Sequence, residues 1–183
     1  MKSYSFNYVV VFAVALLCDS VVIAQKPLVK TVTIKKTGPV AVAANQPYTN
    51  GIKLNAKGIV VKDAYLVFDD ETKVPANNKV NLNQRVTLRI VLSKGFKEVK
   101  GKVFPGGSQK IVLSNGETIL DSQDLYAAYD STGASPADAM FISMKSVITE
   151  IKDKKNYVNV SVKIWDKKTA DNLITASYKL YIK

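Results

Sequence analysis

The sequence has no histidine, and its only cysteine, Cys18, lies near the N-terminus. These absences exclude Ser-His-Asp and Cys-His catalysis in the rest of the chain. They also exclude zinc and copper sites that depend on imidazole or thiolate ligands. The glycine-rich phosphate loops of nucleotide-binding proteins are missing as well. We therefore expect a protein that is not an enzyme and that holds no cofactor.

Carboxylates are the remaining candidates for chemistry. Asp69 and Asp70 are adjacent, and Asp121 and Asp124 share a second stretch. Paired carboxylates catalyse glycoside hydrolysis when they lie about 5 to 10 Å apart, a separation that the sequence does not give. Neither group has the spacing of a calcium loop, so the four residues are weak calcium candidates. The four carboxylates are explained more simply as solvated strand ends and helix caps. A carboxylate-dependent hydrolase is the second alternative for the function.

Long apolar runs are also lacking, since a membrane-spanning helix needs about 20 such residues. The most apolar stretch, residues 8–17, follows Lys2 and precedes Val22-Ile23-Ala24. This order is typical of a secretory signal peptide with a small residue at its cleavage site. We expect residues 1–24 to be a signal peptide cut between Ala24 and Gln25. The mature protein would be secreted or periplasmic, with no transmembrane segment.

Cys18 supports a competing interpretation. A lipoprotein signal is cut before a cysteine that then carries lipid, although the preceding residue is normally small and here it is Leu17. Lipid anchoring at Cys18 would hold the protein on a membrane by acyl chains. Cleavage after Ala24 would instead leave a chain without cysteine, which can form no disulfide. Its stability would then come from a packed core, for which the remaining residues 25–183 suffice.

The charge is strongly positive, with a formal net charge of +11. The signal peptide carries one lysine and one aspartate, so its removal leaves this value unchanged. Nearly all the positive charge is lysine spread along the chain, with only Arg85 and Arg89 besides. Such a surface resists aggregation and edge-strand pairing. The alternative is that the lysines attract anionic polymers or membrane surfaces. Because specific phosphate recognition favours arginine forks, we expect no nucleic-acid partner.

Alternating apolar residues between turn signals predict short strands. They occur at residues 28–36, 59–69 and 80–92, and again after residue 144. Asn115-Gly116 between two apolar runs predicts a hairpin with a type I′ turn, and Pro105-Gly106-Gly107 predicts another turn or bulge. Residues 121–142 interrupt the pattern and predict two short helical turns. We therefore expect the chain to consist of a signal peptide (1–24), an extended segment (25–45) and an all-β antiparallel sandwich (46–183). The sandwich would contain a helical insertion at about 121–142.

The last two predicted strands form a second hairpin. Branched aliphatics alternate from Val158 to Ile164, which places Trp165 in the polar row. With Ile164 opposite Ile174, Tyr157 lies opposite Tyr181 on the outer face, and we place Trp165 opposite Thr175. Lys163 and Lys179 share this face. The candidate ligand-binding residues on this face are Trp165, Tyr157, Tyr181, Lys163 and Lys179. Aromatic rings suit binding because they supply apolar area with a polar group.

Two structural interpretations compete with binding. Tyr157 and Tyr181 form an ordinary cross-strand aromatic pair in the first, worth up to about 1 kcal/mol. In the second, which we favour for the tryptophan, the insertion covers Trp165 through Met140, Phe141 and Met144.

The closing pattern YVNVSVKIWDKK followed by LITASYKLYI resembles the last two strands of immunoglobulin-like and fibronectin-III-like domains of secreted bacterial proteins. The resemblance implies an immunoglobulin-like sandwich and says little about function. The cysteine pair and core tryptophan of antibody domains are absent.

We expect an exported binding or adhesion module that contacts extracellular polysaccharide or an envelope protein. The alternative is an assembly subunit of the cell envelope whose N-terminal strand pairs with a partner's sheet edge.

Overall fold

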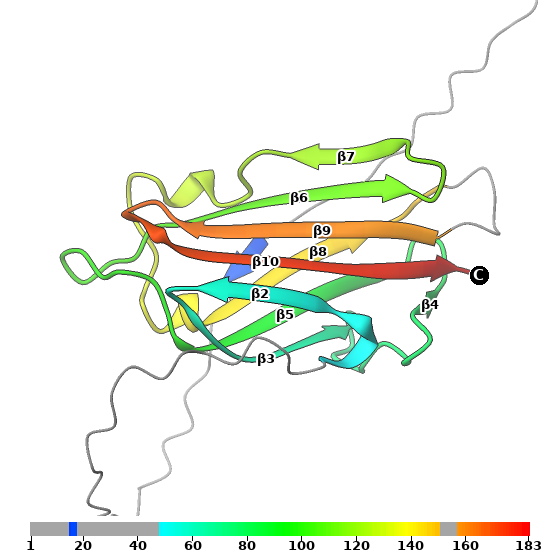
Figure 1. The fold of residues 1–183 in the computed structure, drawn as a ribbon, viewed down its shortest axis with the longest axis horizontal. Helices are drawn as coiled ribbons and strands as arrows, with labels where there is room; N and C mark the ends of the chain where they lie inside the picture. Colours follow the sequence, from blue (N-terminus) through cyan, green and yellow to red (C-terminus); the bar gives the residue numbers. More distant parts are fainter. Residues whose placement is uncertain (1–14, 18–47, 151–156) are drawn as a thin grey trace, which may run out of the picture.

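The structure is a computed structural model that describes residues 15–17, 48–150 and 157–183. Cys18, the Ala24–Gln25 cleavage site and the strand expected at residues 28–36 lie outside the described residues. The described chain folds into two antiparallel sheets, shown in Figure 1 as a front and a back layer. The prediction of an all-β fold is confirmed.

The back layer has the strand order β1-β8-β5-β3, and the front layer has the order β2-β10-β9-β6-β7. A two-residue strand, β4, runs parallel to the end of β10. The strands are β1 (Ala15–Leu17), β2 (Lys53–Lys57), β3 (Val60–Val67), β4 (Lys79–Val80), β5 (Arg85–Lys94), β6 (Pro105–Leu113), β7 (Thr118–Ser122), β8 (Phe141–Val147), β9 (Tyr157–Asp166) and β10 (Thr169–Ile182).

The core forms where the apolar rows of the two sheets face each other. Along β9, Val158, Val160, Val162 and Ile164 are buried, while the residues between them are at least partly exposed. They join one cluster with residues of β5 and β8 such as Leu88 and Met144. A strand that alternates in this way can bury only one face. The opposite face of the front sheet therefore points to solvent.

The hairpin at Asn115-Gly116 is confirmed, because β6 and β7 pair antiparallel. The turn type is not the predicted one. Gly116 has a φ of +91°, but Asn115 is not among the residues with positive φ. Leu113 accepts a hydrogen bond from the Gly116 N–H and donates one to the Glu117 carbonyl. This is the three-residue loop in which a type I turn is followed by a left-handed glycine, and it needs only one positive φ.

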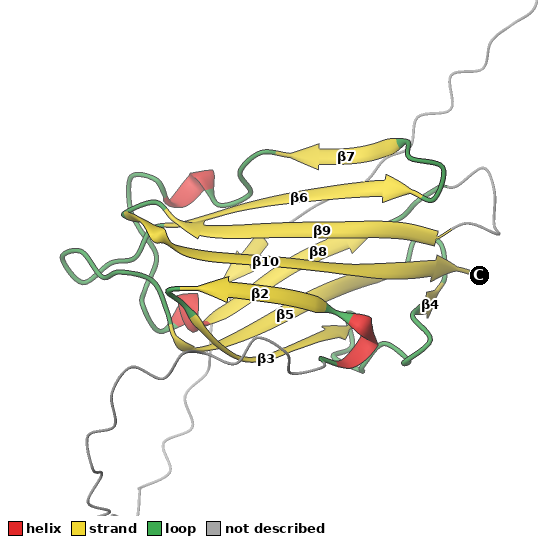
Figure 2. Ribbon diagram, viewed as in Figure 1, coloured by secondary structure: helices red, strands yellow, loops and turns green. Residues whose placement is uncertain are grey.

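The insertion contains two short turns, as predicted, and both are 3₁₀: η2 (Ala127–Tyr129) and η3 (Asp138–Met140). The other 3₁₀ turn of the described residues is η1 (Thr49–Gly51). Figure 2 shows these turns at the ends of the sheets. The insertion starts later than expected, because Asp121 and Ser122 still belong to β7. No helix within the described ranges has the length and apolar character needed to span a bilayer.

Candidate binding face on the front sheet

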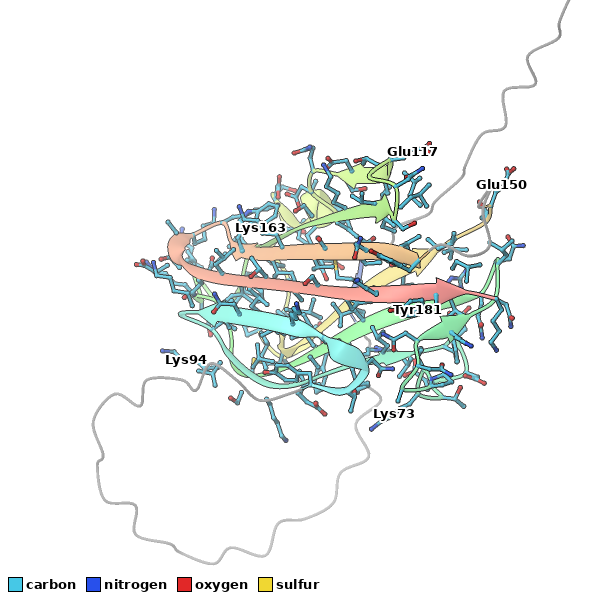
Figure 3. The ribbon with its side chains drawn as sticks, turned by 45° about the vertical axis from the view of Figure 1, so that its right-hand side comes forward. Lys73, Lys94, Glu117, Glu150, Lys163 and Tyr181 are labelled. Carbon is cyan, nitrogen blue, oxygen red and sulfur yellow. The ribbon has the colours of Figure 1, made fainter. Side chains whose placement is uncertain are left out.

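The solvent-facing side of the front sheet carries the five candidate residues. The hairpin register is as predicted at Ile164–Ile174 and Tyr157–Tyr181. The partner of Trp165 is Leu173, so the placement opposite Thr175 is wrong. Thr175 pairs with Lys163 instead, because cross-strand neighbours in this hairpin keep a constant sum of residue numbers. Figure 3 shows Lys163 on β9 and Tyr181 near the end of β10.

Tyr157 and Tyr181 form an aromatic pair at one end of this face. Their ring centroids lie 5.8 Å apart and their planes are tilted by 57°. The Lys179 Nζ lies 4.1 Å from the centroid of the Tyr157 ring, within the range of a cation–π contact. Tyr181 is 41% exposed, which leaves much of its ring accessible to a ligand.

Trp165 lies towards the other end of the face and is half-buried. Its indole covers Gly106 of β6: a Cβ built on Gly106 would lie 2.2 Å from the Trp165 Cε2 atom. Lys163 Nζ lies 5.8 Å from the ring centroid. The indole therefore rests on the backbone of its neighbouring strand and keeps part of its surface open.

The residues expected to cover Trp165 lie elsewhere. Met144 is fully buried in the core, and Phe141 is 44% exposed on β8 of the other sheet. The Met140 sulfur lies 3.0 Å from a Cβ built on Gly95. The insertion instead reaches the opposite face of β6, where the Tyr126 ring fills the space beside Gly107.

The two aromatic rings explain why Pro105-Gly106-Gly107 is a strand and not the predicted turn or bulge. Indole and phenol occupy both sides of β6, so a side chain at either glycine would collide with a ring. Gly107 also donates its N–H to Asp124 Oδ1 at 3.1 Å. The glycines serve the close approach of aromatic rings to the backbone, a recognised use of glycine within strands.

Two adjoining shallow grooves lie between the aromatic ends. One has a volume of about 460 Å³ and is lined from five strands by residues such as Lys53, Ser108 and Lys163. The second, of about 720 Å³, reaches Tyr181 and Lys179. Both include Lys53, Ser161 and Ser177 in their walls. Together they make one open surface along β9 and β10, with lysine, serine and asparagine side chains in its walls.

An asparagine pair shapes the Tyr181 end of the second groove. The buried Asn50 side chain donates to the carbonyls of Val74 and Pro75 and, at 2.7 Å, to Asn78 Oδ1. Asn78 donates in return to the carbonyls of Asn50 and Lys179. These hydrogen bonds join η1 to β10, so the groove wall is held by buried polar contacts and is a fixed feature of the fold.

The groove is positively charged. Among its lining residues are Lys53, Lys110, Lys163 and Lys179, with Asp121 as the only acid. Asp121 is bound to Lys110 at 3.0 Å. Within the described residues, no carboxylate forms an ion pair with Lys53, Lys163 or Lys179. Three ammonium groups are thus available to an anionic ligand.

The four acidic candidates are each bound to protein groups. Asp69 pairs with Arg85 at 2.8 Å. Asp70 accepts hydrogen bonds from the Thr72 hydroxyl and N–H, which lower the pKa of this exposed carboxyl. Asp121 pairs with Lys110. The described residues contain no group of three or more acids, histidines or cysteines placed to hold a metal ion.

Asp124 has a structural role. Its carboxylate accepts hydrogen bonds from the N–H groups of Gly107 and Tyr126, and Lys167 lies 2.6 Å away. Burial alone would raise the pKa of Asp124, but the hydrogen bonds from Lys167, Tyr126 and Gly107 outweigh it and hold the pKa below its usual value. The Asp124 carboxylate therefore clamps the start of the insertion against β6 and against the turn between β9 and β10.

Sequence reasoning found the part of the face that lies on β9 and β10 and missed the part on β2 and β6. Lys53, Asn55, Ser108 and Lys110 line the groove. Alternation within each strand indicates which residues share a face, but not which strands are neighbours. Asn50 and Asn78 were also missed, and the Asn50-Gly51 dipeptide is the only local signal there, one that indicates a turn.

A comparison of the sequence with protein-family models and with curated proteins found no match to either. The function is therefore argued from the geometry of this face.

Proposed function

We propose that the protein is exported, with residues 1–24 removed, and that the front face of its β2-β10-β9-β6-β7 sheet binds an extended polysaccharide or other envelope polymer without catalysing a reaction. The observation that carries this proposal is the shape of the face. Aromatic rings stand towards both ends of a positively charged groove, with Tyr157 and Tyr181 at one end and Trp165 near the other. Such rings stack on sugar rings, and serine, threonine and asparagine side chains bond to hydroxyls.

The dimensions suit a polymer better than a small molecule. Tyr157 and Trp165 are eight residues apart on β9, which corresponds to about 26 Å along a strand. The groove is shallow and open and has no enclosed end, whereas small-molecule sites bury most of their ligand. Lys53, Lys163 and Lys179, which form no ion pair within the described part of the chain, favour a polymer that carries acidic groups over a neutral one.

We also infer that the sandwich is of the immunoglobulin-like or fibronectin-III-like type. The neighbours β3-β5-β8 and β7-β6-β9-β10 correspond in order to strands A-B-E and C′-C-F-G of such domains. β9 and β10 then correspond to the last two strands, on which the sequence resemblance rests. β2 is an addition at the edge of the last strand.

Retention on insoluble polysaccharide and on purified peptidoglycan tests the proposal. Tyr181→Ala and Trp165→Ala should each lower retention about fivefold or more, since one stacked ring contributes on the order of 1 kcal/mol or more. Phe141→Ala is the matched control, because Phe141 is as exposed as Tyr181 but belongs to the other sheet. Thermal unfolding is recorded for every variant. Undiminished retention in both front-face variants would refute the proposal, as would an equal loss in the control.

A further inference from the structure

The outer edge of β8 depends on a strand from the extreme N-terminus. β5 pairs with β8 along its whole length, from Phe141 to Val147. On the other side β1 pairs only with Ile142, Ser143 and Met144. β1 belongs to the residues that we propose are removed on export. Their removal leaves the backbone N–H and C=O groups on this edge of β8 without a strand partner in the described chain.

The other sheet edges are protected and this one is not. β3 breaks its register with β5 twice, around Val61, and exposes Lys62 and Asp63 there. β2 is short and exposes Lys53 and Lys57, and β7 is short with a register shift of its own. Bulges, charges and short length are the usual devices against edge-to-edge pairing. β8 pairs without a register shift and carries a single charge, Lys145.

We propose that the outer edge of β8 is a strand-acceptor site, and that residues 28–36 of a second copy of this chain pair with it. The inference rests on the cleavage after Ala24 in the proposed function and is independent of polymer binding. Residues 28–36, LVKTVTIKK, are rich in β-branched residues and contain no proline. The β1–β8 pairing shows that the edge accepts an antiparallel strand.

The length of the chain favours a second copy over the same copy. An antiparallel strand on β8 ends beside Ile142, whereas the described domain resumes at Tyr48, next to η1. η1 contacts β3 and, through Asn50, the loop at Val74 and Asn78. β3 lies two strands from β8. The Asn83 N–H donates to the Ile148 carbonyl, so the residues after Val80 lie at the opposite end of β8 from Ile142.

The return path within one copy therefore runs along β8, about 20 Å, and then from the outer side of β8 across three strand spacings to β3, about 15 Å, around the outside of the sheet. The eleven residues 37–47 reach at most about 36 to 40 Å when fully extended. Pairing within one copy would need this linker close to its limit. A neighbouring copy receives the segment without that constraint.

Each copy then provides one acceptor edge and one donor segment. The contact is heterologous, so copies join head to tail or close into a reciprocal pair. Backbone hydrogen bonds supply the affinity in strand addition, and alternate side chains supply the specificity. The front-sheet groove is on the other layer and stays open in either arrangement.

The test uses exported protein whose first residue is identified by intact mass. Light scattering at high protein concentration should give a mass at least twice that of one copy. Val32→Pro, which removes a backbone donor from the middle of the segment, should give the mass of one copy. Ala43→Pro is the control, because it makes the same change in the linker and should leave association intact. Hydrogen exchange of those amides of Phe141–Val147 that point away from β5 should be slow in the wild type and in Ala43→Pro, and at least tenfold faster in Val32→Pro.

A monomeric wild-type protein would overturn the inference, as would association that Val32→Pro leaves unchanged. A monomer whose β8 amides lose protection in Val32→Pro would show that the segment folds back on its own copy, and this also overturns the proposal of a second copy. An intact mass that includes residues 1–24 would remove its premise. None of these readouts depends on polysaccharide retention, so failure of the polymer-binding proposal is recorded separately.

Discussion

Gly106 and Trp165 are coupled residues of neighbouring strands. Because a Cβ at Gly106 would lie 2.2 Å from the indole, Gly106→Ala forces the ring or the strand to move and should cost about 1 to 3 kcal/mol of unfolding free energy. In a Trp165→Ala background the same change meets no ring. There it should stabilise the protein by up to about 1 kcal/mol, because alanine loses less backbone entropy than glycine. Urea unfolding of the four proteins measures this double-mutant cycle, and equal costs in both backgrounds would contradict the coupling.

At the scale of elements, the Asp124 clamp should make stability depend on pH. The pKa of Asp124 is lower in the folded protein than its ordinary value of 3.8, so the stabilisation is complete above that value and is lost as the pH falls through the folded pKa. Asp124→Asn should therefore reduce the unfolding free energy at neutral pH by about 1 to 3 kcal/mol. The difference from wild type should shrink as the pH falls below 3.8.

Asp138→Asn is the control for the clamp, because the described contacts of Asp138 include no side-chain hydrogen bond or ion pair. It should unfold like the wild type across the pH range. A difference between Asp124→Asn and wild type that stays constant down to pH 2.5 would show that the carboxylate charge is not what stabilises the clamp.

The elements also show how far the sequence could be interpreted. Alternation in the last hairpin predicted which residues share a face, because a slip of one residue would move a whole apolar row to solvent. The register followed from placing Ile164 opposite Ile174. The Gly106-Gly107 pair was misjudged, because the rings that require the glycines come from residues 126 and 165, far away in sequence. The groove was half predicted for the same reason: β2 and β6 flank β10 and β9 through long-range pairing that no local pattern records.

At the scale of the whole molecule, the two sheets are joined by a polar contact inside the apolar core. Gln109 of β6 donates to Ser146 Oγ of β8 at 2.8 Å, and Ser146 lies 3.4 Å from the Tyr178 hydroxyl of β10. Burial raises the pKa of Tyr178 to about 12, so the phenol stays neutral. Gln109 Oε1 is buried with no hydrogen-bond partner among the described residues. The contact thus includes one costly, unsatisfied acceptor.

This imbalance predicts an order of stabilities. Ser146→Ala leaves both ends of the Gln109 amide without a hydrogen bond. It should lower the free energy of unfolding by about 1 to 3 kcal/mol. Gln109→Met removes the amide, including its unsatisfied oxygen, fills a similar volume and leaves Ser146 beside Tyr178. Gln109→Met should lower the free energy of unfolding less than Ser146→Ala does, and an increase would agree with the same reasoning. Urea unfolding measures both, with unchanged m-values as evidence that the two-layer packing is intact. A larger loss for Gln109→Met would mean that the amide holds the sheets together by a contact beyond its bond to Ser146.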